Sequence, residues 1–243
     1  MARTILITGA STGIGAATAL RLASDNDIVI HYNRSEEAAR QVAQQVQQRG
    51  GRPLMVRADL SSQAGCQALA QAVAQQYGKL DVLVNNAGGL IERSPARQIR
   101  WELLEEIFRL NTFSAMYLTS LCIPLLEKGQ DPSIVNITSI AIRHGAPTAT
   151  IYAAAKGALD VFTRGLAKEL APTIRVNAVA PGVIDTPFHQ KYTTPERLAQ
   201  FRAQTPLGRL GLADEIAQAI QFCIENRFLT GETIDVNGGL FMR

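Results

Sequence analysis

Seven short runs of β-branched and other apolar residues recur along the chain, and a helical pattern follows all but the last of them. The runs span 3–8, 27–32, 54–58, 80–85, 133–138, 174–180 and 232–236. The helical patterns span 13–24, 36–49, 62–77, 100–109, 112–128, 150–170 and 213–225. This alternation predicts an α/β fold with a Rossmann-type, doubly wound, seven-stranded parallel sheet and helices on both faces. The runs are continuously apolar, as strands covered on both faces require.

One domain is expected to hold the whole pattern, from residue 1 to residue 243. The composition is 47% hydrophobic and 19% charged, which allows a large core. No repeat, linker or low-complexity tract interrupts the chain. The polar stretch 186–206 contains three prolines and is predicted to be a substrate lid. Aromatic residues, His189 and several basic residues lie in it; the aromatics are Phe188, Tyr192 and Phe201.

Charge and cysteine content argue against several classes of protein. The net charge of +3 comes from 24 basic and 21 acidic residues without a basic run, which argues against nucleic-acid binding. No apolar run reaches the roughly 18 residues of a membrane span. The first strand begins almost at the N-terminus, so no signal peptide is expected. Cys66, Cys122 and Cys223 are scattered, as are the histidines, so we expect no metal site, no disulfide framework and a cytoplasmic protein.

A glycine-rich loop, "TGASTGIG", joins the first predicted strand to the first predicted helix. Gly9, Gly13 and Gly15 allow the backbone to turn sharply and to approach a ligand closely. The N–H groups and the positive dipole end of the helix suit a pyrophosphate. A plain turn is the alternative, but the place of the loop in the pattern favours dinucleotide binding.

A tyrosine and a lysine stand four residues apart in "IYAAAKG". On the predicted helix 150–170, Tyr152 and Lys156 share one face, and only alanines separate them. The ammonium group is expected to lower the pKa of the phenol, which would then exchange a proton near neutral pH. The alternative is an ordinary amphipathic helix with a surface lysine.

Several motifs together resemble the short-chain dehydrogenase/reductase family over essentially the whole chain. They are "TGASTGIG", "NNAG", "NITS", "YAAAK" and "PGVIDT". Ser139 precedes Tyr152 by the thirteen positions that this family uses, and Asn111 in "RLNTFS" matches its fourth catalytic position. The C-terminal stretch is similar to bacterial members of the 3-oxoacyl-[acyl-carrier-protein] reductase type.

The resemblance implies an NAD(P)-dependent oxidoreductase that reduces a ketone, such as a 3-oxoacyl thioester, to a secondary alcohol, or reduces an aldehyde to its alcohol. Ser139 would bind the carbonyl, and Tyr152 would protonate the alkoxide. Lys156 would bind the nicotinamide ribose, and Asn111 would hold a water that relays protons. The alternatives are a strand cap for Ser139 and a helix kink near 109–112 for Asn111.

Two other functions remain open, a sugar or other alcohol dehydrogenase and a nucleotide-binding sensor without turnover. The complete set of four catalytic positions favours the enzyme over the sensor.

The predicted cofactor site follows the carboxyl ends of the strands, where open α/β sheets bind ligands. Asp59, after the third strand, is a candidate acceptor for the adenine amino group. Asn86 follows the fourth strand, where a simple turn with structural asparagines is the alternative. The predicted cofactor residues are Gly9, Ser11, Thr12, Gly13, Ile14, Gly15, Asn33, Arg34, Ser35, Asp59, Leu60, Asn86, Ala87, Gly88, Tyr152, Lys156, Pro181, Gly182, Ile184 and Thr186.

The stretch "HYNRS" after the second strand carries no carboxylate that would hold the 2′-hydroxyl of NAD. Asn33, Arg34 and Ser35 can instead donate to the 2′-phosphate of NADP, Arg34 bidentately. Ser35 is also a plausible cap of the helix that follows. NADP is therefore favoured. Thr12 stands where many NADP-using relatives carry a basic residue, so NAD is kept as the alternative.

The expected partners are a small carbonyl or alcohol substrate and further copies of the chain. The predicted helices 112–128 and 150–170 are apolar around much of their circumference, and a second subunit is the usual cover for such a surface. The resemblance implies a homotetramer; the alternative is a thick core within one subunit. "GQDPS" after Lys128 departs from carrier-dependent relatives and argues against an acyl carrier protein as partner.

Overall fold

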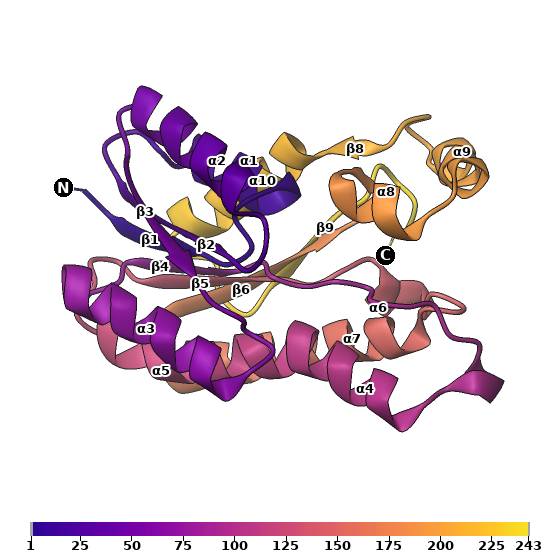
Figure 1. Cartoon of the computed structure of the whole chain (residues 1–243), viewed down its shortest axis with the longest axis horizontal. Coiled ribbons are helices and arrows are strands. Elements are labelled where there is room, and N and C mark those ends of the chain that lie inside the picture. Colours follow the sequence, from indigo (N-terminus) through magenta and orange to yellow (C-terminus); the bar gives the residue numbers. More distant parts are fainter. Residues whose placement is uncertain (1, 243) are drawn as a thin grey trace.

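The computed structural model describes residues 2–242, with the side chains of 190 and 191 left out. Its centre is one seven-stranded sheet in the order β3-β2-β1-β4-β5-β6-β9, in which every neighbouring pair is parallel (Figure 1). The strands are β1 (Thr4–Ile7), β2 (Asp27–Tyr32), β3 (Arg52–Arg57), β4 (Val82–Asn85), β5 (Ser133–Ile137), β6 (Arg175–Pro181) and β9 (Thr233–Val236). The predicted doubly wound sheet is confirmed.

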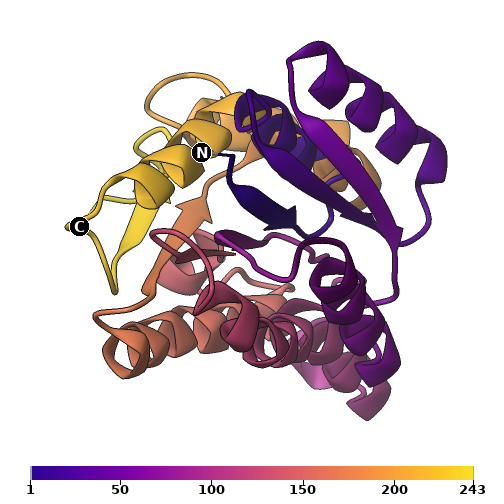
Figure 2. The same ribbon diagram turned by 90° about the vertical axis from the view of Figure 1, so that its left-hand side faces the viewer.

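Helices cover both faces of the sheet and make three layers, seen from the side in Figure 1 and from one end in Figure 2. One face carries α1 (Gly13–Arg21), α2 (Glu36–Gln48) and α10 (Ala213–Glu225). The other carries α3 (Gln63–Tyr77), α5 (Ser114–Leu126) and α7 (Thr150–Leu170). Along β1, Ile5 and Ile7 enter the first core and Leu6 the second, which explains the unbroken apolar runs. None of the helices described is long and apolar enough to cross a membrane.

A buried polar network ties the centre of the sheet to two helices. Asn85 and Asn136 are paired in register on β4 and β5, and Asn85 Nδ2 donates to Asn136 Oδ1 at 2.9 Å. Asn85 also donates to Thr119 of α5, and Asn136 donates to Thr163 of α7, each at 2.9 Å. The structural alternative therefore holds for Asn85, and the network fixes α7 against the strand that leads into Ser139.

The predicted break between helices 100–109 and 112–128 is wrong. The chain runs from α4 (Trp101–Phe108) through a π-helical turn (Arg109–Phe113) directly into α5. A π turn carries one extra residue and leaves carbonyls without their usual partners, and such turns are frequent at functional sites. Here Asn111 Nδ2 takes up the freed carbonyl of Ile107 at 2.9 Å.

The stretch 186–206 folds into two short helices, α8 (Pro187–Tyr192) and α9 (Pro195–Gln204), above the carboxyl ends of the strands (Figure 1). Each helix begins with proline, and the threonine before it, Thr186 or Thr194, occupies the N-cap position. Thr-Pro at a helix start is a readable signal that the sequence interpretation missed.

Four other short elements were not predicted. They are the 3-10 turn η1 (Ala96–Gln98), α6 (Ala141–His144) and the paired strands β7 (Ile184–Asp185) and β8 (Gly211–Leu212).

Candidate active site

A cavity of about 740 Å³ opens between the carboxyl ends of the strands and the lid formed by α8 and α9. Three predicted residues, Gly15, Asp59 and Asn111, are not among the residues that line it. The predicted residues that do line it are Gly9, Ser11, Thr12, Gly13, Ile14, Asn33, Arg34, Ser35, Leu60, Asn86, Ala87, Gly88, Ser139, Tyr152, Lys156, Pro181, Gly182, Ile184 and Thr186. The fold thus brings most of the predicted site together from six strand ends, those of β1 to β6.

The glycine loop is shaped by three glycines with different tasks. Gly9 and Gly13 have φ of +63° and +56°, a left-handed conformation that favours glycine. Gly15 permits packing, because a Cβ there would collide with the carbonyl oxygen of Gly9. Thr12 occupies the N-cap position of α1, but its side chain accepts no hydrogen bond from the first turn. The loop and the uncapped start of α1 therefore form a cradle suited to an anionic ligand.

His31 braces this loop, a role that the sequence interpretation missed. Its Nδ1 accepts a hydrogen bond from the N–H of Gly9 at 2.9 Å, so the ring is neutral and Nε2 donates to the carbonyl of Ala58 at 3.1 Å. Burial lowers the pKa of His31, which favours the same neutral form. A histidine in the second strand of this pattern gives no sequence signal by itself, because the contact joins residues 22 positions apart.

Thr8 and Asn86 join the end of β4 to the glycine loop. Asn86 Nδ2 donates to the carbonyls of Thr8 and Gly9, at 2.8 and 3.1 Å. Thr8 Oγ1 accepts from the N–H groups of Asn86 and Ala87, both at 2.9 Å. Asp59 Oδ1 accepts from the N–H and the hydroxyl of Ser61, which caps its own turn. The adenine role of Asp59 therefore stays a prediction.

The rim of the cavity after β2 is basic. Arg34 is exposed, lines the cavity and forms no ion pair with any residue in the described range. Glu36, two positions later, is paired with Arg40 one turn along α2. Ser35 occupies the predicted N-cap position of α2, but its side chain makes no cap hydrogen bond there. Its hydroxyl is thereby left for a ligand.

Ser139, Tyr152 and Lys156 converge on the inner wall of the cavity. Ser139 follows β5, accepts from the N–H of Ala141 at 3.1 Å, and has its hydroxyl beside the phenol of Tyr152, close enough to lower the pKa of that phenol. Lys156 is only 3% exposed, and its Nζ donates to the carbonyl of Ile137 at 2.7 Å. The helix α7 therefore presents Tyr152 and Lys156 towards the end of β5, as their spacing predicts.

The pKa values of this pair differ from the expectation. Burial raises the pKa of Tyr152 to about 12, opposed only by the hydrogen bond from Ser139. Burial also lowers the pKa of Lys156 to about 8. The predicted lowering of the tyrosine pKa by the lysine is therefore wrong for the folded chain. Distant segments enclose both groups, and loss of water favours the neutral form of each.

Asn111 lies behind this wall, inside the π turn. Its Nδ2 donates to the carbonyl of Gly89 at 2.8 Å as well as to Ile107, and its Oδ1 accepts from the N–H of Gly89 at 3.0 Å. A Cβ on Gly88 would lie 2.7 Å from Asn111 Oδ1 and 3.1 Å from Lys156 Nζ. Asn111 thus satisfies the helix kink and fixes the segment beside Lys156, while its water-relay role stays a prediction.

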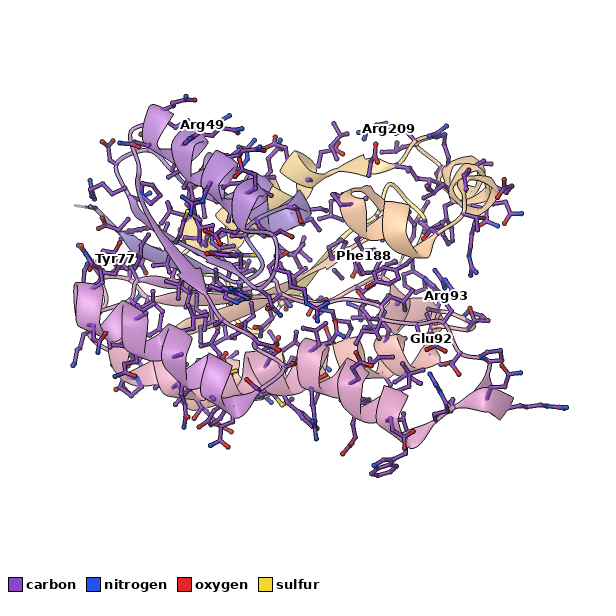
Figure 3. The ribbon with its side chains drawn as sticks, viewed as in Figure 1. Arg49, Tyr77, Glu92, Arg93, Phe188 and Arg209 are labelled. Atoms are coloured by element: carbon purple, nitrogen blue, oxygen red, sulfur yellow. The ribbon has the colours of Figure 1, made fainter. Side chains whose placement is uncertain are left out.

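The lid supplies an apolar wall opposite Tyr152. Phe188, which hangs from α8 in Figure 3, has its ring centroid 6.2 Å from that of Tyr152. The rings of His189 and Tyr192 meet Phe188 edge-on, at 5.1 and 5.2 Å. Burial lowers the pKa of His189 to about 4, so this ring is neutral. A substrate beside Tyr152 would therefore meet aromatic surface from above.

Comparison with known proteins identifies the family to which the chain belongs. The family model described as enoyl-(acyl carrier protein) reductase matches residues 9–241. General stress protein 39 of Bacillus subtilis is 38% identical over 241 residues, which cover 98% of this chain and 84% of that protein. The chain is a short-chain dehydrogenase/reductase. It is therefore an NAD(P)-dependent oxidoreductase.

Further members of the short-chain dehydrogenase/reductase family match along their whole length. The 3-oxoacyl-[acyl-carrier-protein] reductase FabG of Thermotoga maritima is 35% identical over 239 residues, covering 97% of this chain and 96% of that protein. The solved structure of the angucycline C-6 ketoreductase LanV with bound NADP matches with a TM-score of 0.90 at 28% identity, covering 98% of this chain and 95% of that one. The promiscuous reductase LugOII, which catalyses keto-reduction at C1 in lugdunomycin biosynthesis, matches with a TM-score of 0.89 at 32% identity, covering 99% and 98%.

Replacement of Lys156 by methionine tests the buried ammonium group through the pH dependence of unfolding. The pKa is about 8 in the folded chain and 10.5 ordinarily, so the unfolded chain binds more protons between these values. Lys156 therefore makes the free energy of unfolding rise with pH through this window, and Tyr152 acts only above its ordinary pKa of 10. Between about pH 7.5 and about pH 9.5, the free energy of unfolding measured in urea should rise by about 2 kcal/mol less in Lys156→Met than in the wild type.

The matched control is Lys168→Met, an exposed lysine on the same helix, which should follow the wild type. The loss of the bond to Ile137 shifts all Lys156→Met values equally and leaves the slope untouched. Parallel pH curves for the wild type and Lys156→Met would refute the burial of the charge.

Proposed function

We propose that this short-chain dehydrogenase/reductase uses NADPH to reduce a ketone to a secondary alcohol, or an aldehyde to a primary alcohol. The observation that carries the proposal is the contact between Ser139 and the phenol of Tyr152, beside buried Lys156, in the cavity that the glycine loop also lines. A hydroxyl pair of this kind can bind and protonate one carbonyl oxygen. The ketoreductases among the relatives support the direction of the reaction.

The residues of the chain divide the work as follows. Ser139 donates to the carbonyl oxygen and orients it towards Tyr152. Tyr152 gives its proton to that oxygen as negative charge develops, and its raised pKa keeps the phenol protonated at neutral pH. Lys156, one turn along α7 from Tyr152, would supply the next proton to the phenol and would hold the ribose of the cofactor. The nicotinamide, when bound, supplies the hydride.

The cavity fits a dinucleotide that carries extra phosphate. Gly9, Gly13 and the uncapped start of α1 offer N–H groups to the pyrophosphate. Asn33, Arg34 and Ser35 offer donors to a 2′-phosphate at the end of β2. No aspartate or glutamate is among the residues in the described range that line the cavity. These features favour NADP over NAD. Three buried free thiols suit a reducing compartment such as the cytoplasm.

Tyr152→Phe should keep NADPH affinity and lose turnover, because the ring stays and the proton donor goes. Acid–base catalysis of this kind typically contributes on the order of 10²–10⁴-fold. NADPH oxidation is followed by absorbance against ketones and 3-oxoacyl thioesters, and NADPH affinity by fluorescence titration.

Tyr117→Phe is the control, since its phenol accepts bonds from two surface glutamines outside the cavity. A Tyr152→Phe rate above about a tenth of the wild type, on that same scale, would refute the assignment. A wild type that binds NADPH but turns over no member of the panel would favour the nucleotide sensor.

Arg34→Glu should weaken NADPH far more than NADH, because the carboxylate repels the 2′-phosphate. The ratio of the two dissociation constants should move by roughly 10- to 100-fold, the worth of a lost charged hydrogen bond. Arg49→Glu makes the same charge change at the far end of α2, outside the cavity, and should leave the ratio unchanged. An unchanged ratio in Arg34→Glu would return the preference to NAD.

We also propose a homotetramer in which α5 and α7 pair across a two-fold axis. Phe113, at the end of the π turn that leads into α5, and Val161 of α7 are 54% and 62% exposed, whereas Leu121 and Phe162 pack partly against the core of their own chain. Light scattering after size exclusion should give four times the chain mass of 26.3 kDa. Val161→Glu should reduce that mass. A wild-type mass of one chain across micromolar concentrations would exclude the assembly.

A further inference from the structure

Two arginines line the lid side of the cavity. Arg93 lies between β4 and α4, and Arg197 lies on α9, more than a hundred positions later in the chain. Both line the cavity together with Phe188 and His189. In Figure 3, Arg93 lies below the lid, opposite the segment that carries Phe188.

Arg93 has unused hydrogen-bond donors. Its Nε donates to the carbonyl of Tyr192 at 3.3 Å, and its two terminal nitrogens have no hydrogen-bond partner among the residues described. Burial lowers the pKa of Arg93, and the positive charge of Arg197, which lines the same cavity, lowers it further. Arg197 itself stacks over the ring of Phe201, at 5.7 Å from its centroid.

The carboxylates nearby are engaged elsewhere or lie off the cavity. Glu92, next to Arg93 in the chain, is paired with Arg100 at 2.7 Å. Glu196, next to Arg197, is exposed in the first turn of α9 and does not line the cavity. Against the effect of burial, the charge of Asp185 raises the pKa of His189 slightly, but Asp185 does not line the cavity. Among residues 2–242, it forms no ion pair with Arg93 or Arg197. The chain therefore places two cations on one cavity wall, and no aspartate or glutamate of residues 2–242 lines that cavity.

Such a pair costs free energy unless an anion binds to it. Two like charges that are partly removed from water repel each other, and an anion between them relieves both the repulsion and the unmade hydrogen bonds. The planar guanidinium group matches the oxygens of a carboxylate or a phosphate. The site is thus specific for a class of chemical group.

The arginines lie on the substrate side of Tyr152. Tyr152 contacts Phe188, Phe188 contacts Tyr192, and the carbonyl of Tyr192 binds Arg93. The glycine loop and Arg34, which suit the phosphates of the dinucleotide, line other parts of the same cavity. A ligand whose carbonyl lies at Tyr152 would therefore extend under the lid towards Arg93 and Arg197.

We propose that Arg93 and Arg197 form an anion subsite for the carboxylate or phosphate of a carbonyl substrate whose reacting group lies against Ser139 and Tyr152. The inference rests on the proposed reductase function and adds the substrate class. The physiological substrate is a keto acid or a keto phosphate, and the aromatic rings of the lid cover the chain between its two ends.

Matched pairs of substrates test the subsite. NADPH oxidation is measured with 4-oxopentanoate and 5-oxohexanoate against their methyl esters, and with dihydroxyacetone phosphate against dihydroxyacetone, to separate a carboxylate from a phosphate. In the wild type, kcat/KM should favour one anionic series by about 10- to 100-fold, the worth of a charged hydrogen bond. The ratio within a pair should fall to about one in Arg93→Gln and Arg197→Gln, and a general loss of activity cancels from it.

Binding gives a readout that does not depend on turnover. With saturating NADP⁺, glutarate or inorganic phosphate should raise the Tm of the wild type and should not raise that of Arg93→Gln or Arg197→Gln. Arg202→Gln, an exposed arginine on the same helix α9 that does not line the cavity, is the control and should behave as the wild type in both assays.

The outcomes separate the two proposals. A rise in Tm with glutarate or phosphate in the wild type that is lost in Arg93→Gln and Arg197→Gln supports the subsite. If none of the probes is reduced in that case, the result contradicts only the reductase function. Esters or dihydroxyacetone that react well, with no preference for the anionic partner, overturn the subsite and leave the reductase function standing. Protection that is absent in the wild type, or that persists in Arg93→Gln and Arg197→Gln, also overturns the subsite.

Discussion

The hydrogen bonds around Thr8 hold together the two strand ends on which the site depends. The strand order reverses between β1 and β4, so the connections from these neighbours leave towards opposite edges of the sheet and open a crevice between them. Thr8 Oγ1 receives the N–H groups of Asn86 and Ala87, and Asn86 returns two bonds to the loop after β1. The glycine cradle and the wall beside Lys156 are therefore parts of one rigid unit.

The sequence predicts the strands of the sheet well and the pKa values of the site residues poorly, for a physical reason. Alternation of apolar runs and helical patterns is local, so the seven strands and the face shared by Tyr152 and Lys156 are readable in advance. The pKa of Tyr152 depends on how deeply other segments bury it. The hydrogen bond from Gly9 to His31 likewise joins the loop after β1 to a residue of β2. No local pattern encodes these contacts. The two helices of the lid are different, because the Thr-Pro pairs at which they begin are a local sequence signal for the start of a helix.

Charge is distributed unevenly in this molecule. The whole chain carries only +3, yet its main cavity is lined by Arg34, Arg93, Lys156 and Arg197, and by no carboxylate in the described range. A cavity with low-dielectric walls concentrates the field of such groups and attracts anionic ligands from a distance. A near-neutral total charge therefore says little about what a protein binds. The placement of a few cations, each contributed by a separate segment, decides it.

The π turn at Arg109–Phe113 has a consequence for how this chain can change over generations. An ordinary helix from α4 to α5 would need one residue fewer and would satisfy its own carbonyls. The extra residue turns Asn111 towards Gly89, and it costs the helix a regular bond that the side chain of Asn111 replaces at Ile107. Selection for a sturdier helix alone would delete that residue. Its presence marks a position where the fold has given up local regularity to keep the backbone beside Lys156 in place.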